Sequence, residues 1–336
     1  MAAQAHRRSA DACPIVTTEQ PLVSVVIPAY NAARTVVSTV QTVLDQTVRD
    51  LEVVVVDDGS SDDTVEVARG IDDPRVRVVA RENGGAAAAR NTGIAEAKGT
   101  WVAFLDSDDQ WLPVKLERQL AYVDAHPDVH AVQTGAYLVD DDLQVHHVRR
   151  CRPSRDALWE SLLFRNLPAF GSTLMIRRSK LVEIGCFDTN LEILEDWELA
   201  VRSARYCNLR SIEEPLTLYR THPGNRSRNL DIHLAPGELV LGRLFADPDT
   251  PERIRAGRRE IYAHFYTMLA GGALKVGRYG ECGRWTIRAL RSDPRSIKYI
   301  AELPVRRASR FVSGVVARRR GGVPGIDRPP VIQADG

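Results

Sequence analysis

The chain has 336 residues and a formal net charge of only +1, with 26% charged and 44% hydrophobic residues. This length allows two domains or one large one, and the balanced charge excludes a global field that would attract nucleic acid. The five cysteines form no C-x-x-C pair, which argues against a disulfide framework or a zinc knuckle and favours a reducing cytosol. No segment is long and apolar enough to predict a transmembrane helix.

Short apolar runs alternate with amphipathic segments from Leu22 to about Leu120, after a lead-in over residues 1–20 that is expected to be disordered. The runs are rich in β-branched residues, as in strands covered on both faces. Predicted strands are Leu22–Tyr30, Leu51–Gly59, Arg75–Ala80 and Trp101–Asp108. The spacing predicts βαβ crossovers and a parallel α/β sheet.

Helices are predicted between these strands. Asn31 is a possible cap for the first, and Ser60 and Asp63 have capping-box spacing before the second. The third is the alanine-rich stretch that ends near Gly99, and a fourth is expected after Pro113.

The pattern loosens after residue 124, which divides the chain into predicted parts. We expect a catalytic domain over 21–228, with a nucleotide-binding half at 21–124 and an acceptor half at 125–228. A helical region is expected over 229–320 and a disordered tail over 321–336. The triple acid Asp140–Asp142 is expected to form an exposed hairpin turn.

Acidic residues follow two of the predicted strands, where open α/β sheets collect their ligands. Alternate residues of a strand share a face, so Asp106 and Asp108 are expected to point the same way. Two carboxylates suit Mg²⁺ or Mn²⁺ that takes its other ligands from water and substrate phosphates. The alternative is that these acids cap the helix beginning near Pro113.

Asp57 and Asp58 end the neighbouring strand pattern and could hydrogen-bond the base or ribose of a nucleotide. They could equally form a turn before Gly59. The stretch "NGGAAAARN" matches neither the P-loop nor the dinucleotide fingerprint. Arg90 within it could face a diphosphate or a solvent-side acid.

Five blocks occur in one order: "SVVIPAYNAARTV", "VVVVDDGSSDDT", "NGGAAAARNTGIAEAKGTWVAFLDSDDQW", "GCFDTNLEILEDWEL" and "YRTHPGNRS". Together they resemble family 2 glycosyltransferases of the GT-A fold, from about Leu22 to Arg228. The resemblance implies an α/β fold with a Rossmann-like, mainly parallel sheet flanked by helices and a helical C-terminal extension. It also implies a nucleotide-diphosphate sugar donor, a bound Mg²⁺ or Mn²⁺, and inverting transfer to a hydroxyl acceptor in polysaccharide, glycolipid or cell-surface glycan synthesis.

The resemblance assigns roles to single residues. The nucleoside pocket would be formed by Pro28, Tyr30, Asn31, Asp57 and Asp58. The DxD pair would be Asp106 and Asp108, with Asp108 the direct metal ligand.

In the ED motif Asp196 would be the general base and Glu195 its support. The segment that would close over the donor contains Arg220, His222 and Ser227. One departure is Leu194, which stands where a glycine is frequent and puts the local loop geometry in question.

Other functions are compatible with the same residues. A nucleotidyltransferase acting on a sugar phosphate could share the sheet and its acids, and a non-catalytic module could bind a nucleotide sugar without turnover. The expected partners are the donor and a glycan or lipid-linked acceptor, with no nucleic acid. The stretch "RRASRFVSGVVARRR" predicts either a solvated helix or an interfacial helix on anionic lipid, so we expect a cytoplasmic protein with possible peripheral membrane contact.

Overall fold

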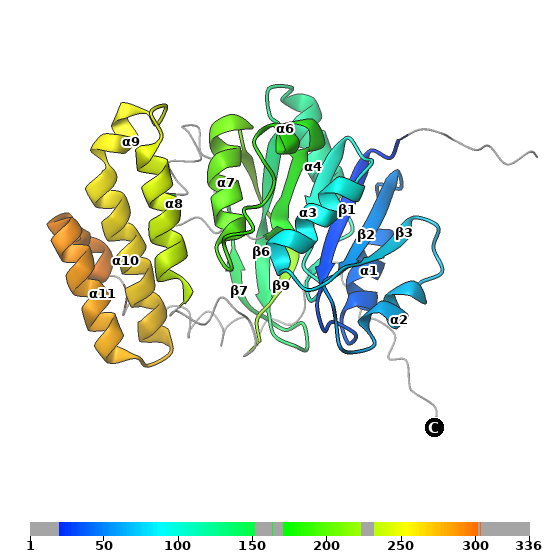
Figure 1. The fold of residues 1–336 in the computed structure, drawn as a ribbon, viewed down its shortest axis with the longest axis horizontal. Coiled ribbons are helices and arrows are strands. Elements are labelled where there is room, and N and C mark those ends of the chain that lie inside the picture. The colour runs from blue at the N-terminus through cyan, green and yellow to red at the C-terminus, as the bar shows by residue number, and fades with distance from the viewer. Residues whose placement is uncertain (1–19, 152–162, 164–170, 223–231, 302, 304–336) are drawn as a thin grey trace, which may run out of the picture.

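The computed structural model describes residues 20–151, 163, 171–222, 232–301 and 303. Helices cover both faces of one curled sheet, and a further block of helices packs beyond one side (Figure 1). The strands are β1 Val23–Ala29, β2 Leu51–Asp57, β3 Val76–Ala80, β4 Trp101–Phe104, β5 Gln110–Trp111, β6 Ala131–Val139, β7 Val145–Arg149, β8 Leu174–Arg177 and β9 Arg210–Arg220.

The helices follow the strands in alternation through the first half and then dominate the end of the described chain. They are α1 Val36–Leu44, α2 Thr64–Arg69, α3 Ala86–Glu96, α4 Lys115–Ala125, α6 Arg178–Glu183, α7 Glu195–Tyr206, α8 Leu234–Ala246, α9 Glu252–Ala256, α10 Arg258–Lys275 and α11 Tyr279–Ser292, with 3-10 turns η1 Gly171–Thr173 and η4 Pro294–Ser296.

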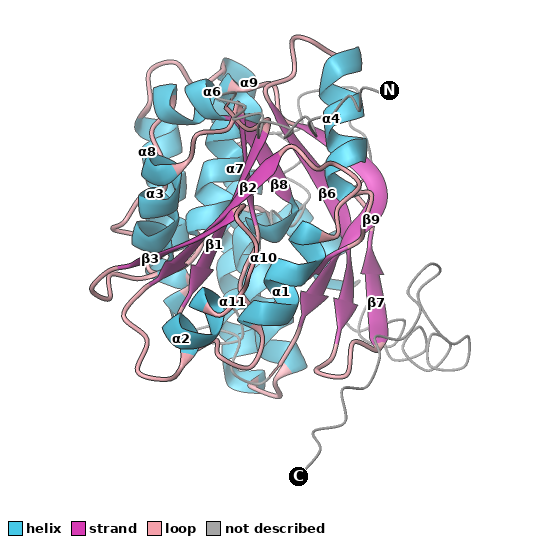
Figure 2. Ribbon diagram, turned by 90° about the vertical axis from the view of Figure 1, so that its right-hand side faces the viewer, coloured by secondary structure: helices cyan, strands magenta, loops and turns pink. Residues whose placement is uncertain are grey.

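The nine strands form one mixed sheet in the order β3-β2-β1-β4-β8-β6-β9-β5, with β7 paired to β6. The first four are parallel, as the βαβ spacing predicts, whereas β8 runs antiparallel to both β4 and β6 (Figure 2). Because β2, β1 and β4 are parallel neighbours, their carboxyl ends lie side by side at one edge of the sheet. Any group carried past those ends is therefore brought together.

Every residue of β1, β2 and β4 is buried, which explains their unbroken apolar character. Successive residues enter opposite cores: Val25 and Ile27 pack in the cluster that includes α1 and α4. Val26 packs in the other, with α3, α7 and the C-terminal helices. Because α7 shares that second core with α8 and α10, the C-terminal helices pack on the same hydrophobic core as the sheet.

Helix beginnings differ from those predicted by the capping residues. Asn31 does not cap a helix; its side-chain oxygen accepts from the Ser61 backbone N–H at 2.9 Å. The Ser60–Asp63 capping box is also not formed, since Asp63 makes no side-chain cap bond and Ser60 Oγ accepts from Asn31 N–H at 2.9 Å. These polar side chains join two loops instead. The hairpin turn at Asp140–Asp142 is confirmed, because Asp140 accepts from the backbone N–H groups of Asp142 and Gln144.

No helix in the described part of the chain combines the length and apolar character needed to cross a bilayer.

Candidate active site

The acidic residues meet at the carboxyl edge of the parallel strands. Asp57 is the last residue of β2 and pairs in register with Ala29 of β1. On the other side of β1, Val26 pairs with Phe104, the last residue of β4. The acids after Phe104 therefore emerge beside Asp57, with only β1 between them.

Asp106 and Asp108 lie in a turn and not in a strand, which corrects the expectation of a shared strand face. The strand ends at Phe104, and Asp109 N–H donates to the Asp106 carbonyl at 3.0 Å to close the turn. The side chains of Asp106 and Asp108 are 30% and 31% exposed, so both remain open to a ligand. The alternative that they cap the next helix finds no support, because α4 has no side-chain cap.

Asp109, to which the sequence assigned no role, connects this turn to η1 and to the end of β9. Its carboxylate is buried and accepts from Ser172 Oγ at 2.5 Å and from the Arg220 backbone N–H at 2.8 Å. Ser172 Oγ also accepts from Asp106 N–H at 3.0 Å. Burial, with Asp108 and Asp106 close by, raises the pKa of Asp109 well above its ordinary value. The position of Asp109 directly after the DxD pair was a signal in the sequence for its role, whereas no sequence pattern near Ser172 indicates one.

A buried lysine supports the short turn η1, which carries Ser172. Lys115 Nζ lies 3.8 Å from the centre of the Trp111 ring and donates to Gln119 at 2.7 Å. Trp111 Nε1 in turn donates to the Ser172 carbonyl at 2.8 Å. Burial lowers the pKa of Lys115 well below its ordinary value. The short turn that carries Ser172 is thus fixed on both sides.

Arg90 joins the two acidic motifs. Its guanidinium is buried within α3 and donates through Nη2 to Asp106 at 2.6 Å and through Nη1 to Glu195 at 2.7 Å. Burial alone would lower the pKa of Arg90, but Asp106 and Glu195 together raise it, so the cation persists at every working pH. The sequence left open a diphosphate or a solvent-side acid as the partner of Arg90, and the structure shows Arg90 pointing inward to two acids of the candidate site.

The ED pair begins α7. Glu195 is its first residue, and Asp196 accepts from the Trp197 backbone N–H at 2.7 Å. Burial, and then the neighbouring charge of Glu195, raise the pKa of Asp196 to about 7, even though Arg90 acts in the opposite direction. A carboxyl group with such a pKa is suited to take a proton near neutral pH.

Leu194, directly before this pair, adopts the left-handed conformation with φ 66° and ψ 13°. This is the region in which glycine is favoured and a bulky L-residue is strained. Leucine therefore stands where glycine is frequent in the family, and the backbone still adopts the left-handed conformation.

The two acids at the end of β2, Asp57 and Asp58, have different hydrogen-bond partners. Asp58 is saturated: its carboxylate pairs with Arg81 and accepts from the backbone N–H groups of Gly84 and Gly85, the latter at 2.7 Å. Asp57 accepts through Oδ2 from Gly59 and Ser60, both at 3.2 Å. Its Oδ1 is buried without a hydrogen-bond partner among the described residues. Asp57 therefore retains an acceptor for a ligand, whereas Asp58 holds the glycine-rich loop.

The remaining predicted pocket residues follow β1. Pro28 is buried within the strand, and Tyr30 beside it is 55% exposed. Asn31 has φ 51° and connects this loop to the loop after Asp57. Tyr30 directly follows Ala29, the register partner of Asp57, so an exposed aromatic ring and a buried unsatisfied acceptor lie at neighbouring strand ends. Such groups can hold a base by stacking and hydrogen bonding.

The end of β9 reaches the same turn. Arg220 donates through Nε to the Asp108 carbonyl at 2.9 Å, and His222 Nε2 lies 3.1 Å from Asp108 Oδ2. Ser227, the third candidate from this segment, lies outside the described residues. Among the described residues no group of three or more His, Cys, Asp or Glu side chains is arranged to hold a metal. The donor set thus fits a cation that takes most of its ligands from substrate, since Asp106 and Asp108 are partly open and few in number.

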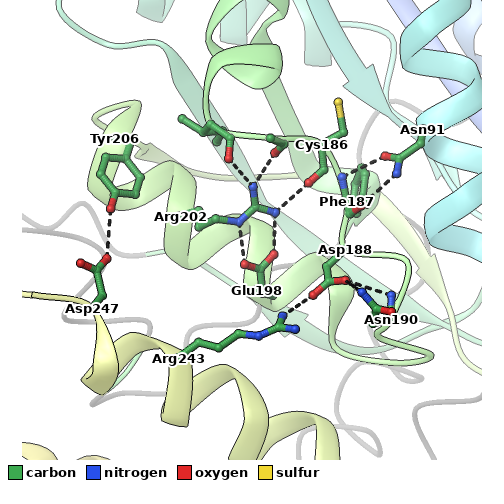
Figure 3. Close-up of polar contacts among 12 residues, drawn as sticks. Asn91, Cys186, Phe187, Asp188, Asn190, Glu198, Arg202, Tyr206, Arg243 and Asp247 are labelled. Atoms are coloured by element: carbon green, nitrogen blue, oxygen red, sulfur yellow. Dashed lines mark hydrogen bonds and ion pairs between the residues drawn. The ribbon is translucent and has the colours of Figure 1, made fainter. Parts of the chain in front are cut away.

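The loop that leads into the ED pair is held by side chains of α7 and α3 (Figure 3). Arg202 of α7 donates to the carbonyls of Ile184, Gly185 and Cys186. Asn91 of α3 exchanges two hydrogen bonds of 2.9 Å with the Phe187 backbone.

The C-terminal helices hold the same loop and helix. Arg243 of α8 pairs with Asp188 of the loop, and Asp247 just after α8 pairs with Arg205 of α7 at 2.7 Å. These contacts connect α8 directly to the helix that carries the ED pair.

Comparison with known proteins identifies the family to which this chain is similar. The family model described as glycosyl transferase family 2 matches residues 24–185. The succinoglycan biosynthesis protein ExoO of Rhizobium meliloti is 34% identical over 259 residues, covering 70% of this chain and 72% of that protein. The Escherichia coli UDP-Glc:alpha-D-GlcNAc-diphosphoundecaprenol beta-1,3-glucosyltransferase WfaP is 30% identical, covering 62% of this chain and 80% of the relative.

Solved structures agree on the fold. Staphylococcus aureus TarS 1-349 in complex with UDP-GlcNAc superposes with a TM-score of 0.58 at 18% identity, over 91% of this chain and 93% of that one. The mannosyltransferase PcManGT from Pyrobaculum calidifontis, in complex with GDP-Man and Mn²⁺, gives 0.55 at 19% identity over 89% and 87%. The GT-A fold expected from the sequence is confirmed. The chain belongs to glycosyltransferase family 2.

Proposed function

We propose that this glycosyltransferase takes its sugar from a nucleoside diphosphate sugar and transfers it with inversion to a hydroxyl acceptor, using Asp196 as the general base. The observation that carries the proposal is the position of Arg90, which holds Asp106 of the DxD turn and Glu195 of the ED pair on one guanidinium. A donor-binding motif and a candidate base motif thereby occupy one site.

The nucleoside would lie at the ends of β1 and β2. The unsatisfied Oδ1 of Asp57 supports a hydrogen bond to an N–H donor of the base, and Tyr30 offers an exposed ring at the end of the neighbouring strand. We assign Asp58 an indirect role, because both of its oxygens already hold the glycine-rich loop. Pro28 and Asn31 would shape the pocket wall.

A divalent cation, Mg²⁺ or Mn²⁺, would be held by Asp108, with Asp106 beside it. When bound it would neutralise charge that grows on the leaving diphosphate. His222 and Arg220 would keep the turn in place, since both contact Asp108. Asp109 and Ser172 would hold the same turn through their mutual hydrogen bond.

The reaction itself is assigned to Asp196. Inversion requires the acceptor oxygen on the sugar face opposite the diphosphate, with a base in hydrogen-bond reach of its proton. The raised pKa of Asp196, about 7, suits that transfer near neutral pH. Glu195 would assist by holding Arg90 and by raising the pKa of its neighbour.

For the acceptor we propose a growing glycan or a lipid-linked sugar. WfaP, a relative at 30% identity, is named for an acceptor on diphosphoundecaprenol. ExoO is named as a succinoglycan biosynthesis protein. The basic stretch Arg306–Arg320, for which the sequence predicts either a solvated helix or an interfacial helix on anionic lipid, lies outside the described residues.

The test is a donor-hydrolysis and transfer assay with a panel of nucleoside diphosphate sugars and Mn²⁺. Asp196→Asn is expected to lower turnover about 100-fold or more while sparing donor binding. Asp108→Ala is expected to remove the dependence of nucleotide affinity on Mn²⁺, measured by calorimetric titration with and without the metal. Asp142→Asn, at an exposed acid in the hairpin turn, is the matched control. Full turnover in Asp196→Asn would refute the base assignment.

A further inference from the structure

The outermost helix of the described chain, α11, turns a basic and apolar face to solvent. One side of α11 is used for packing: Trp285 is 7% exposed and stacks on Tyr266 of α10, and Ala289 is fully buried. The opposite side carries Arg284, Ile287 and Arg291, all exposed and spaced three and four residues apart. We call these three residues the outer face of α11. In Figure 1, α11 lies at the edge of the molecule farthest from β3.

The charge of this region is one-sided. Every exposed charged residue between positions 275 and 298 is a lysine or arginine, namely Lys275, Arg284, Arg291, Arg295 and Lys298. The two acids of the same stretch are not exposed: Glu281 is partly buried and pairs with Arg278, and Asp293 is buried against Arg295. The local field is therefore positive although the whole chain has a net charge of only +1.

Large apolar side chains are exposed within the same stretch. Ile287 is 51% exposed at the centre of the outer face, and Ile297 is 56% exposed just after η4. Val276 and Tyr279, at the turn that leads into α11, are 45% and 66% exposed. Four of the ten exposed large hydrophobic residues of the described chain thus fall within 22 positions. Arginines beside isolated apolar side chains are the composition of a helix that lies on a bilayer surface.

We propose that the outer face of α11 binds the headgroups of an anionic membrane, with Ile287 entering the acyl boundary. The arginines supply attraction to lipid phosphates, about fivefold in partition coefficient for each basic residue near the surface. Ile287 supplies the apolar part of the interaction, which a purely electrostatic partner would not use. The inference rests on the described surface and does not depend on the proposed chemistry.

Two other occupants fit less well. The chain's own segment 304–320 could fold back, but it contains six arginines and no acid, so its charge has the same sign as the face. Nucleic acid would match the arginines but would leave Ile287 and Ile297 exposed. An anionic bilayer satisfies both the charge and the apolar residues.

The proposal is tested by vesicle co-sedimentation of the full chain. Vesicles of phosphatidylcholine alone are compared with vesicles of equal parts phosphatidylcholine and phosphatidylglycerol. We expect binding to the anionic vesicles only, and a drop of roughly 30-fold in partition coefficient for Arg284→Gln/Arg291→Gln, which removes two basic residues. Arg284→Glu/Arg291→Glu, which reverses both charges, is expected to lose more than the Gln variant, and Ile287→Ser to weaken binding without changing its salt dependence.

The matched control reverses two exposed cations on the nucleotide-binding half, Arg69→Glu/Lys98→Glu, which changes the net charge equally and should leave vesicle binding unaltered. Equal losses in both double variants, or no loss in the α11 variant, would overturn the proposal. So would RNA binding that displaces the vesicles and disappears in Arg284→Glu/Arg291→Glu, because nucleic acid would then be the partner. Donor hydrolysis, measured without vesicles, should stay at the level of the unmodified chain in every one of these variants.

Discussion

Asp106 and Glu195, 89 positions apart in the chain, are held by the two terminal nitrogens of Arg90 at 2.6 and 2.7 Å. A change at one motif is therefore transmitted to the other through a single buried side chain. Because the guanidinium is planar and forked, it fixes both carboxylates in direction as well as in charge. Arg90 thus fixes the position of the DxD turn relative to the ED pair.

Replacing Arg90 by lysine keeps the charge but leaves one donor group too few to reach both acids. We expect kcat to fall about tenfold or more while donor affinity changes little, because misplacing the base affects chemistry more than binding. Arg90→Gln should also destabilise the fold by about 3–5 kcal/mol, since two carboxylates lose their buried partner. Turnover, calorimetric titration and denaturant unfolding measure the three effects.

A matched control for this test is Arg77→Lys. Arg77 also bridges two acids, Glu52 and Glu96, at 3.1 Å each, but it lies in β3 away from the carboxyl edge. Its replacement should leave kcat unchanged. An Arg90→Lys enzyme with full kcat would contradict the positioning role.

Much of this architecture could be predicted from the sequence because the parallel half obeys local rules. Strands buried on both faces need unbroken apolar runs, so β1 and β2 could be located to within one or two residues. Parallel strands also align their carboxyl ends, so the acids after β2 and β4 could be placed at one edge before any contact was known.

The contacts between distant segments could not be predicted in this way. Arg90 and Glu195 are 105 positions apart, and no periodicity relates them. Ser172 lies after a stretch without a regular pattern, so its bonds to Asp106 and Asp109 had no local signal. Likewise, the saturation of Asp58 by the glycine-rich loop depends on tertiary geometry alone.

The pH dependence of kcat/KM should report Asp196. A base acts in its deprotonated form, so activity should rise with pH through an acidic limb near 7, the pKa of Asp196. The charge of Glu195 contributes to that raised pKa, so Glu195→Gln should move the limb to lower pH. Glu183→Gln, at an exposed acid of α6, is the control. Profiles are compared at one fixed Mn²⁺ concentration, and a limb that stays in place or moves upward in Glu195→Gln would count against the assignment.

The same raised pKa has a cost for stability. Folded Asp196 binds its proton more tightly than the unfolded group, whose pKa is near 3.8. As pH rises from about 4 to about 7 the unfolded chain releases this proton first, so the fold loses stability across that window. Asp196→Asn should therefore raise the free energy of unfolding by at least about 1 kcal/mol at pH 8 and by almost nothing at pH 4. Thermal unfolding at the two pH values checks the difference, and an equal gain at both would exclude this cause.

Asp57 and Asp58 should respond differently to the same substitution. Asp57→Asn puts a partly positive amide where a base N–H is expected, so affinity for nucleoside diphosphates should fall about tenfold or more with little effect on stability. Asp58→Asn weakens the Arg81 pair and the bonds to Gly84 and Gly85, so it should cost about 1–3 kcal/mol of stability. Titration calorimetry and denaturant unfolding separate the two. Equal loss of affinity in both would place Asp58 in the pocket as well.

At the left-handed position before the ED pair, glycine should be more stabilising than alanine, which is the opposite of their order inside a helix. Leu194→Ala and Leu194→Gly lose the same side-chain contacts, but only glycine accepts φ 66° without strain. The glycine variant should therefore be more stable than the alanine variant by about 1 kcal/mol. At Gln41, exposed within α1, the order should reverse because alanine favours a helix. Denaturant unfolding of the four variants decides the matter: if alanine is the better residue at both positions, the turn at Leu194 carries no strain, and the glycine frequent at this place in the family needs another explanation.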